Sequence, residues 1–330
     1  MKTKLLLIIL LLGLMPETVQ AYDFKVDGLC YRYYWSGTDE KYVAVTHEDA
    51  TPDNESHYNV AGYYGLSGDI VIPSHVTYSG TKYKVVVIDS FSFVNCNEIT
   101  SITIPDGISF LGVDAFAGCS NLTSVTLPNS IKNIVDGCFK DCKNLEKVII
   151  PNSVKYINGN AFEGCRNLKS ITIPNSVEII GSHAFKGCKN LISVEIPNSV
   201  KSIGGYAFEY CDELTSVTIP NTLTTLPKGV FRGCGLKTVT IPGSVKEIDY
   251  AAFEGCKMSS VIIPKSVESI KKYAFDCSEL TSVTIENSDI SIENDVFDKN
   301  SVHQIIVPKG SVEKFKEKLP VEFHDKLVER

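Results

Sequence analysis

Apolar and polar positions recur in the same order along most of this chain of 330 residues. The stretch LISVEIPNSVKSIGGYAFEYCDE, residues 191–213, represents the pattern. Its first part alternates, with Leu191, Val194 and Ile196 apolar and Ser193 and Glu195 polar. Such alternation predicts a short strand with one inward and one outward face. Pro197 then removes a backbone donor and Asn-Ser favours a turn, so the strand should end there.

The proline also marks the period of the pattern. It recurs every 23 residues from Pro105 to Pro220, and the later units step by 22 residues up to Pro308, with a glutamate replacing one proline. A phenylalanine stands eleven residues after each unit's marker, from Phe116 to Phe297, and Phe93 precedes them. A fixed period of this length predicts a solenoid in which each coil completes its core against the next. The large inward residues should then form one internal row, including Phe162, Phe185 and Phe208.

The flanking segments differ from the repeat and divide the chain into four parts. Residues 1–21 have two lysines, an apolar run and a small-residue end, which together predict a secretory signal peptide. Residues 22–69 alternate without repeating and predict an N-terminal β cap, and about nine extra residues around Tyr78–Thr81 predict a hairpin. The repeats should span 70–310, about ten units of 22–23 residues, and the apolar spacing of 311–330 predicts a short helical cap. The apolar run of the leader is short for a membrane span, and the sequence holds no second one.

The repeat line IPNSVKxIGxxAFxGCxNLxSVxI, as in residues 173–196, resembles the BspA-like, or treponemal-type, leucine-rich repeat family of surface and secreted proteins. The ending VPKGSVEKFKEKL is also similar to endings in that family. The resemblance implies a β-rich α/β solenoid, a leucine-rich repeat with a parallel β-sheet on one face, closed by an N-terminal β cap and a short C-terminal helical cap. It also implies an adhesin-like binding role toward host matrix or bacterial surface proteins.

Nine of the eleven cysteines occupy one position per unit, so they should stack in a ladder. Parallel side chains about 4.8 Å apart are poorly placed for disulfides, whose Cβ atoms lie about 3.8 Å apart. We therefore expect buried free thiols with weak hydrogen bonds to the backbone. A metal site is the alternative, but the chain has no Cys-x-x-Cys pair.

The sequence offers no catalytic constellation and no cofactor motif. The six histidines are scattered, and neither His-Glu-x-x-His nor Gly-x-Ser-x-Gly occurs. We therefore predict no enzymatic activity and no cofactor. The formal net charge of −7 disfavours nucleic acid as a partner, because nucleic-acid binding needs basic surface.

Candidate binding residues lie on two surfaces. Outward strand positions form columns of Ser and Thr that three residues interrupt: Ile149, Glu195 and Ile262. Aromatic side chains gather on a lateral edge, where large contact area at low entropy cost suits an interface. That edge comprises His183, Tyr206, Tyr210, Tyr250 and Tyr273. The same rings could instead pack over neighbouring coils, and Ser and Thr are also ordinary residues of a solvated strand.

These features together predict a protein exported by a signal peptide that is secreted, periplasmic or peripherally attached to the surface. Its expected role is protein–protein binding, with a host matrix or bacterial surface protein as the ligand. Two alternatives stay open, a carbohydrate-binding module with a glycan ligand and a self-associating structural protein of the envelope.

Overall fold

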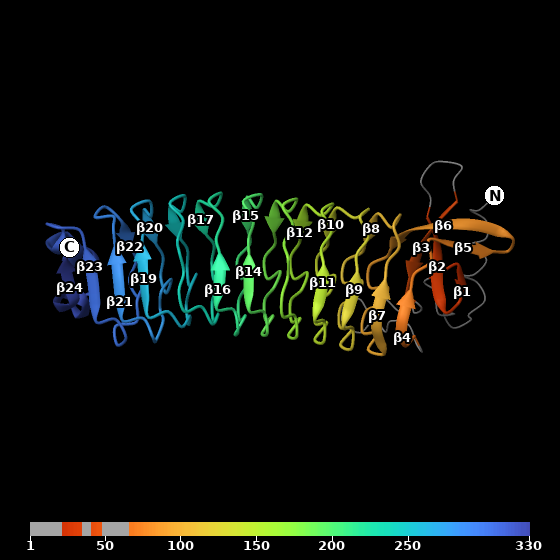
Figure 1. Cartoon of the computed structure of the whole chain (residues 1–330), viewed down its shortest axis with the longest axis horizontal. Helices are drawn as coiled ribbons and strands as arrows, with labels where there is room; N and C mark the ends of the chain where they lie inside the picture. The colour runs from red at the N-terminus through yellow and green to blue at the C-terminus, as the bar shows by residue number, and fades with distance from the viewer. Residues whose placement is uncertain (1–21, 35–40, 48–65) are drawn as a thin grey trace, which may run out of the picture.

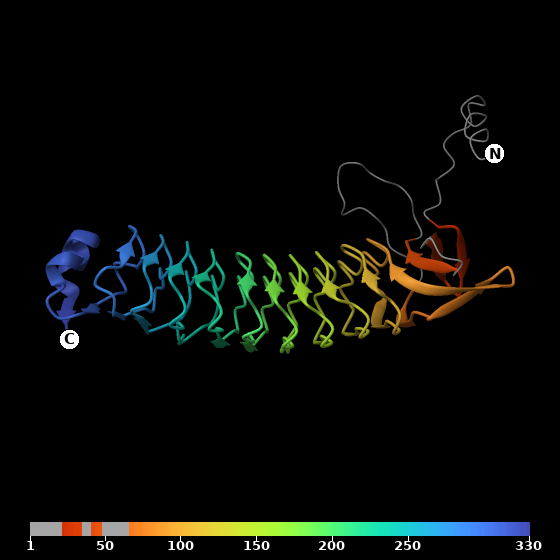
Figure 2. The same ribbon diagram turned by 90° about the horizontal axis from the view of Figure 1, so that it is seen from above.

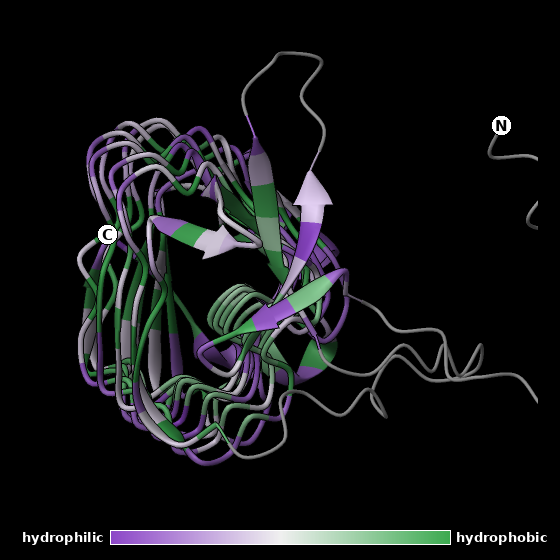
Figure 3. Cartoon of the chain, turned by 90° about the vertical axis from the view of Figure 1, so that its right-hand side faces the viewer, coloured by the Kyte–Doolittle hydropathy of each residue, from purple (hydrophilic) through white to green (hydrophobic). Residues whose placement is uncertain are grey.

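The computed structural model describes residues 22–34, 41–47 and 66–330. These residues form an elongated stack of coils, with the N-terminal strands at one end and a short helix at the other (Figure 1). The predicted signal peptide, residues 1–21, lies outside the described residues, as does part of the predicted N-terminal cap. Viewed along its length, the stack superposes coil upon coil (Figure 3).

One face of the stack is built from short parallel strands, one per coil, which confirms the predicted strand face. Neighbouring strands pair at equivalent repeat positions, as in Val148 with Val125 and Val194 with Val217. Each outward residue therefore stands beside its counterpart in the next coil. The strands fall into three groups: β4 (Gly68–Val71), β7 (Ile99–Thr103), β9 (Ser124–Thr126) and β11 (Lys147–Ile149); β14 (Ser193–Glu195) and β16 (Ser216–Thr218); and β19 (Ser260–Ile263), β21 (Ser282–Ile285), β23 (Gln304–Val307) and β24 (Leu327–Glu329).

A second row of two-residue strands, which the sequence pattern did not predict, runs along another side of the coil. Each of these strands ends in an apolar residue just before the chain turns. The row comprises β8 (Phe110–Leu111), β10 (Asn133–Ile134), β12 (Tyr156–Ile157), β13 (Ile179–Ile180), β15 (Ser202–Ile203), β17 (Thr225–Leu226), β18 (Glu247–Ile248), β20 (Ser269–Ile270) and β22 (Ser291–Ile292). These strands pair in parallel in two groups, β10 to β15 and β17 to β22, while β8 pairs with β6 (Thr81–Ile88) of the N-terminal sheet.

Pro227 explains why this second row is interrupted between β15 and β17. The residue at the same position in other coils donates its backbone N–H to the preceding coil, as Gly204 does to Ile180 at 2.8 Å and Asp249 to Leu226 at 2.9 Å. Proline has no N–H, so the bond to Ile203 cannot form.

The strand face is interrupted twice, at residues 170–173 and 238–240. The second break follows a loop that is one residue shorter than in earlier coils, at Cys234–Leu236. A glycine is required in that loop, because a Cβ atom on Gly235 would lie 2.4 Å from the carbonyl oxygen of Asp212. The sequence of the first break contains no residue that accounts for it.

The core confirms the predicted row of phenylalanines. Rings from Phe93 to Phe297 stack along the axis at centroid distances of 5.2–6.1 Å. The ring centroids of Phe162 and Phe185 lie 5.4 Å apart, and those of Phe185 and Phe208 lie 5.2 Å apart. A single coil could not bury its own phenylalanine ring, so each coil depends on its neighbours to complete the core.

Both ends of the row are covered. The predicted hairpin is present, since β5 (His75–Tyr78) and β6 (Thr81–Ile88) pair antiparallel through Ser79 and Gly80, which have positive φ. It joins a sheet with β1 (Phe24–Val26), β2 (Leu29–Tyr34) and β3 (Tyr42–Thr46) (Figure 2).

The opposite end has more than the expected helix. Helix α1 (Val312–Lys318) is followed by a 3-10 helix, η2 (Val321–Lys326), and the chain then returns to the strand face as β24. Phe323 of η2 stands edge-on to Phe297 at 6.2 Å and covers the last ring of the row. The sequence pattern did not predict this returning strand.

Candidate functional site

The three residues that interrupt the Ser and Thr columns lie on the strand face with their side chains outward. Ile149 at the end of β11 is 64% exposed and Ile262 in β19 is 58% exposed, and Glu195 at the end of β14 is also exposed. Burying such isoleucines in a partner would be favourable, because exposed apolar area in water is costly.

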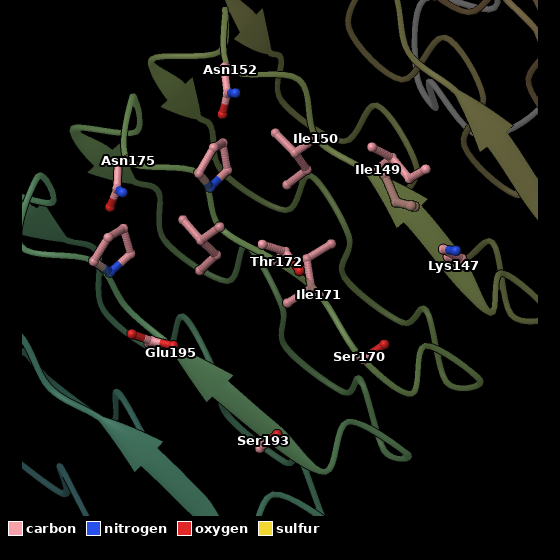
Figure 4. Close-up of a pocket in the computed structure, with 14 residues that line it drawn as sticks. Lys147, Ile149, Ile150, Asn152, Ser170, Ile171, Thr172, Asn175, Ser193 and Glu195 are labelled. Atoms are coloured by element: carbon pink, nitrogen blue, oxygen red, sulfur yellow. The ribbon is translucent and has the colours of Figure 1, made fainter.

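A hollow opens on this face between β11 and β14, and we call it the strand-face groove. Its volume is about 760 Å³. Figure 4 shows Ile149 on one side and Glu195 on the other, with Ser170, Ile171 and Thr172 between them. The structure therefore brings two of the predicted residues, Ile149 and Glu195, into one hollow. The groove is lined by Lys147, Val148, Ile149, Ile150, Asn152, Ser170, Ile171, Thr172, Ile173, Pro174, Asn175, Ser193, Glu195 and Pro197.

The hollow continues toward the next coils at the strand ends. A second cavity of about 440 Å³ shares Asn175, Glu195 and Pro197 with the groove and extends to Asn221. Its rim repeats the Pro-Asn pairs that end each strand, so amide groups stand in a row along it. The combined surface is polar along its rim, and Ile149 is the largely exposed apolar side chain among the residues that line it.

The groove coincides with the first break in the strand face. Across the described residues, no backbone hydrogen bond joins Ile171, Thr172 or Ile173 to either neighbouring coil. The only such bond near this segment is from the N–H of Ile192 to the carbonyl of Lys169, at 3.3 Å. Residues 171–173 therefore lack the backbone pairing that β11 and β14 make with their other neighbours.

Two opposite charges stand in the groove. Lys147 and Glu195 are exposed, and within the described ranges neither forms an ion pair. Glu146 and Lys169, on the adjacent loops, pair with one another at 3.5 Å, so they largely neutralise each other. The groove therefore offers one ammonium and one carboxylate to a ligand. Lys147 was not singled out from the sequence, although it interrupts the serine column as Ile149 interrupts the threonine column.

Ile262 does not belong to the groove. It lies three coils beyond Glu195 along the same face, after the second break. It is an isolated exposed apolar residue, which is common on soluble proteins.

The predicted aromatic edge forms a real column, but its rings largely pack on each other. His183 stacks on Tyr206 at 5.3 Å, and the ring of Tyr206 also covers Gly229, where a Cβ atom would lie 2.2 Å from it. The ammonium of Lys228 lies 5.6 Å from the Tyr206 ring and 5.0 Å from the Tyr250 ring. Tyr250 then meets Tyr273 edge-on at 5.7 Å. These contacts use much of the ring surface within the protein.

Tyr210 lies apart from this column. It is 43% exposed, and its ring covers Gly233 of the next coil. Like His183, Tyr206 and Tyr273, it has a positive φ, a backbone conformation that costs a non-glycine residue about 1–2 kcal/mol. Glycine occupies the same position in other coils, for example Gly187.

Comparison with known families decides the wider class. The family model described as "BspA type Leucine rich repeat region (6 copies)" matches residues 86–215 and 201–319, which is more than half of the chain. The chain belongs to the BspA-type leucine-rich repeat family. A comparison with curated proteins gives no significant match.

Several solved structures resemble this chain. A leucine-rich repeat protein from Bacteroides ovatus is 26% identical with a TM-score of 0.60, covering 93% of this chain and 76% of its own. A leucine rich cell surface protein from Faecalibacterium prausnitzii is 21% identical over 92% of this chain and 98% of its own, with a TM-score of 0.46. The pneumococcal vaccine antigen PcpA is 17% identical over 93% and 98%, with a TM-score of 0.47.

The cysteine ladder of this BspA-type solenoid is built as predicted. All eleven cysteines are buried free thiols. Eight of them donate a hydrogen bond from Sγ to the carbonyl of the phenylalanine one coil earlier, at 2.9–3.3 Å: Cys119, Cys142, Cys165, Cys188, Cys211, Cys234, Cys256 and Cys277. Burial raises their pKa values, so the thiols are held protonated.

The described residues hold no group of three or more His, Cys, Asp or Glu side chains placed to bind a metal ion. Nor does any described helix have the length and apolar character needed to cross a bilayer. Within this part of the chain, the strand-face groove is therefore the best candidate for a functional site.

Proposed function

We propose that this BspA-type repeat protein is exported and binds another protein through its strand face, with the strand-face groove as the main contact. The observation that carries the proposal is the composition of the strand-face groove. It opens where three outward positions, Lys147, Ile149 and Glu195, depart from the Ser and Thr pattern, so its walls differ from the rest of the strand face.

Export is supported by the leader-like pattern of residues 1–21, with two lysines before an apolar run. A protein ligand is supported by the family, whose repeats form extended surfaces suited to protein ligands, and the ligand we propose is a host matrix or bacterial surface protein. We propose no catalytic step, because the groove is lined by a single carboxylate and by no His or Cys side chain.

Glycan binding is the weaker candidate. Sugar rings bind proteins by lying against free aromatic faces, and the rings of the lateral edge lie mainly against each other or against glycine backbone. The groove itself contains no aromatic side chain. A glycan array probed with the exported chain should therefore give no strong signal.

The test uses substitutions that return the groove to the repeat pattern. The double variant Ile149→Thr/Glu195→Thr places at each position the residue found at Thr126, Thr172 and Thr218, so the fold should be preserved. We expect it to lose at least tenfold in capture of a protein ligand from host or bacterial surface fractions, measured by pull-down and confirmed with the purified ligand.

The matched control is Ile262→Thr, which makes the same chemical change on the same face outside the groove. It should bind like the unmodified chain. Equal capture by all three proteins, or loss confined to the control, would contradict the groove as the main contact.

A further inference from the structure

The strand-face groove presents its two charges at a defined separation. Lys147 and Glu195 lie two coils apart, which is about 10 Å at the usual strand spacing, and they are offset by two residues along the strand, about 7 Å. Their Cα atoms are thus separated diagonally by about 12 Å. In an extended polypeptide, residues i and i+4 are about 13 Å apart and point to the same side.

One exposed apolar side chain lies beside the line between the two charges. Ile149 is 64% exposed, whereas Ile150, Ile171 and Ile173 are buried, and the outward residues between the charges are Ser170 and Thr172 (Figure 4). A ligand side chain midway between the charges would lie one coil and one residue from Ile149, about 6 Å, and could pack against it. On an extended peptide this is residue i+2, on the same side as i and i+4.

The amides at the rim add a reason for a peptide ligand. The side-chain amides of Asn152 and Asn175 stand at the rim of the groove (Figure 4). A peptide main chain carries alternating donors and acceptors that can bond to such amides.

Resting on the proposed function, we infer that the groove takes an extended segment of a partner protein with the pattern acidic–x–apolar–x–basic, read in one chain direction or the other. The acidic side chain meets Lys147, the apolar side chain packs against Ile149, and the basic side chain meets Glu195. Charge complementarity selects the ligand, because neither charge has a partner within the described chain.

The experiment selects binders from a phage-displayed library of random twelve-residue peptides on the full chain. We expect groove-dependent peptides to be enriched in the five-residue pattern. Removing either charge, with Lys147→Ser or Glu195→Thr, should weaken a selected peptide about two- to fivefold, which is typical of exposed ion pairs.

The decisive variant exchanges the charges, Lys147→Glu/Glu195→Lys. It should bind the selected peptides at least tenfold more weakly, and it should recover affinity for the same peptides synthesised with their acidic and basic residues exchanged. Both substitutions are on exposed side chains, and circular dichroism with a melting curve checks that the variant folds.

The outcomes separate this inference from the proposed function. Peptides that depend on the groove but show no charge pattern, or that bind the exchanged variant unchanged, overturn the inference and leave a protein-binding groove in place. The inference is also overturned if only glycans or second copies of the chain compete for the groove. Equal ligand capture by the groove variant and the Ile262→Thr control instead overturns the proposed function itself.

Discussion

At the scale of single residues, each coil uses a cysteine where a small side chain must face the core and still donate a hydrogen bond. The Sγ atom of Cys188 donates to the carbonyl of Phe162 at 3.3 Å, and the same contact recurs along the ladder. Alanine would fill similar space without the donor, and serine would bring a hydroxyl that is more costly to bury. The hydrogen bond of the thiol therefore links the backbone at each phenylalanine to the cysteine of the next coil.

Burial of the thiols makes stability depend on alkaline pH. The folded-state pKa is raised above the ordinary value of 9.0, to about 12 for Cys277, because burial disfavours the thiolate. The contribution of the buried thiols to the free energy of unfolding is therefore complete below pH 9. As pH rises above 9, this contribution falls by about 1.4 kcal/mol per pH unit for each thiol. We expect the urea midpoint to fall steeply between pH 9 and 10, and Cys188→Ala to reduce that slope.

The same burial predicts thiol reactivity. A thiol-specific reagent at pH 8 should label almost none of the eleven cysteines in the folded chain and all of them in denaturant. Stability that stays flat from pH 8 to 10, or rapid labelling of the folded chain, would contradict a buried protonated ladder.

At the scale of elements, the two faces of the coil are held together unevenly. Backbone pairing is interrupted on the second row at Pro227 and on the strand face at residues 238–240, on opposite sides of one coil. The rings there are also more tilted, with Phe231 at 19° and 21° to its neighbours against 3–12° for the ring pairs before it. Arg232 spans the same coil by pairing with Glu209 at 3.5 Å and Glu254 at 2.9 Å.

These interruptions predict local differences in hydrogen exchange. Amides of residues 171–173 and 238–240 lack backbone partners in the described structure, so they should exchange faster than Val125 and its neighbours in β9. Exchange followed by mass spectrometry on overlapping peptides measures this directly. Equal protection at 125 and 171 would show that the strand face is continuous in solution.

Much of this architecture was predictable from the sequence because residues at equivalent positions recur at a fixed spacing. The row through Phe185, the thiol ladder and the hairpin at Ser79 and Gly80 all follow from spacing and turn residues. The second row of strands was missed because two residues are too few to show alternation. Pro227 could have indicated its interruption, since proline cannot donate to the ladder.

The site was less predictable, because the groove is formed by residues of several coils rather than by a pattern within one coil. Ile149 and Glu195 stood out as exceptions to their column, but the break at 170–173 that joins them has no signature in its residues. For the lateral edge, the sequence indicated that Tyr206 and Tyr250 share a surface, but not that Lys228 fills the space between them.

At the scale of the whole molecule, stability comes from contacts between neighbours and from covered ends. A solenoid of this kind is a one-dimensional array whose last coil would expose its core without a cap. Phe323 and β24 provide that cover, with Phe323 edge-on to Phe297 and β24 paired with β23.

Removal of residues 311–330 should therefore expose the ring of Phe297 and the edge of β23. We expect the shortened chain to aggregate, because unpaired strand edges and apolar surface promote association. Light scattering and sedimentation measure this. Phe323→Ala is the milder comparison and should lower stability by about 3–5 kcal/mol while the chain stays monomeric. A shortened chain that remains monomeric and equally stable would contradict the capping role.

The shared register of the coils has one more consequence. Because every coil presents the same joining surface to both neighbours, a duplicated unit of 23 residues could be inserted far from the groove without altering either end. Each insertion would move the two ends apart by about 4.8 Å. The length of the molecule could thus change in steps of one coil while its binding surface stays the same.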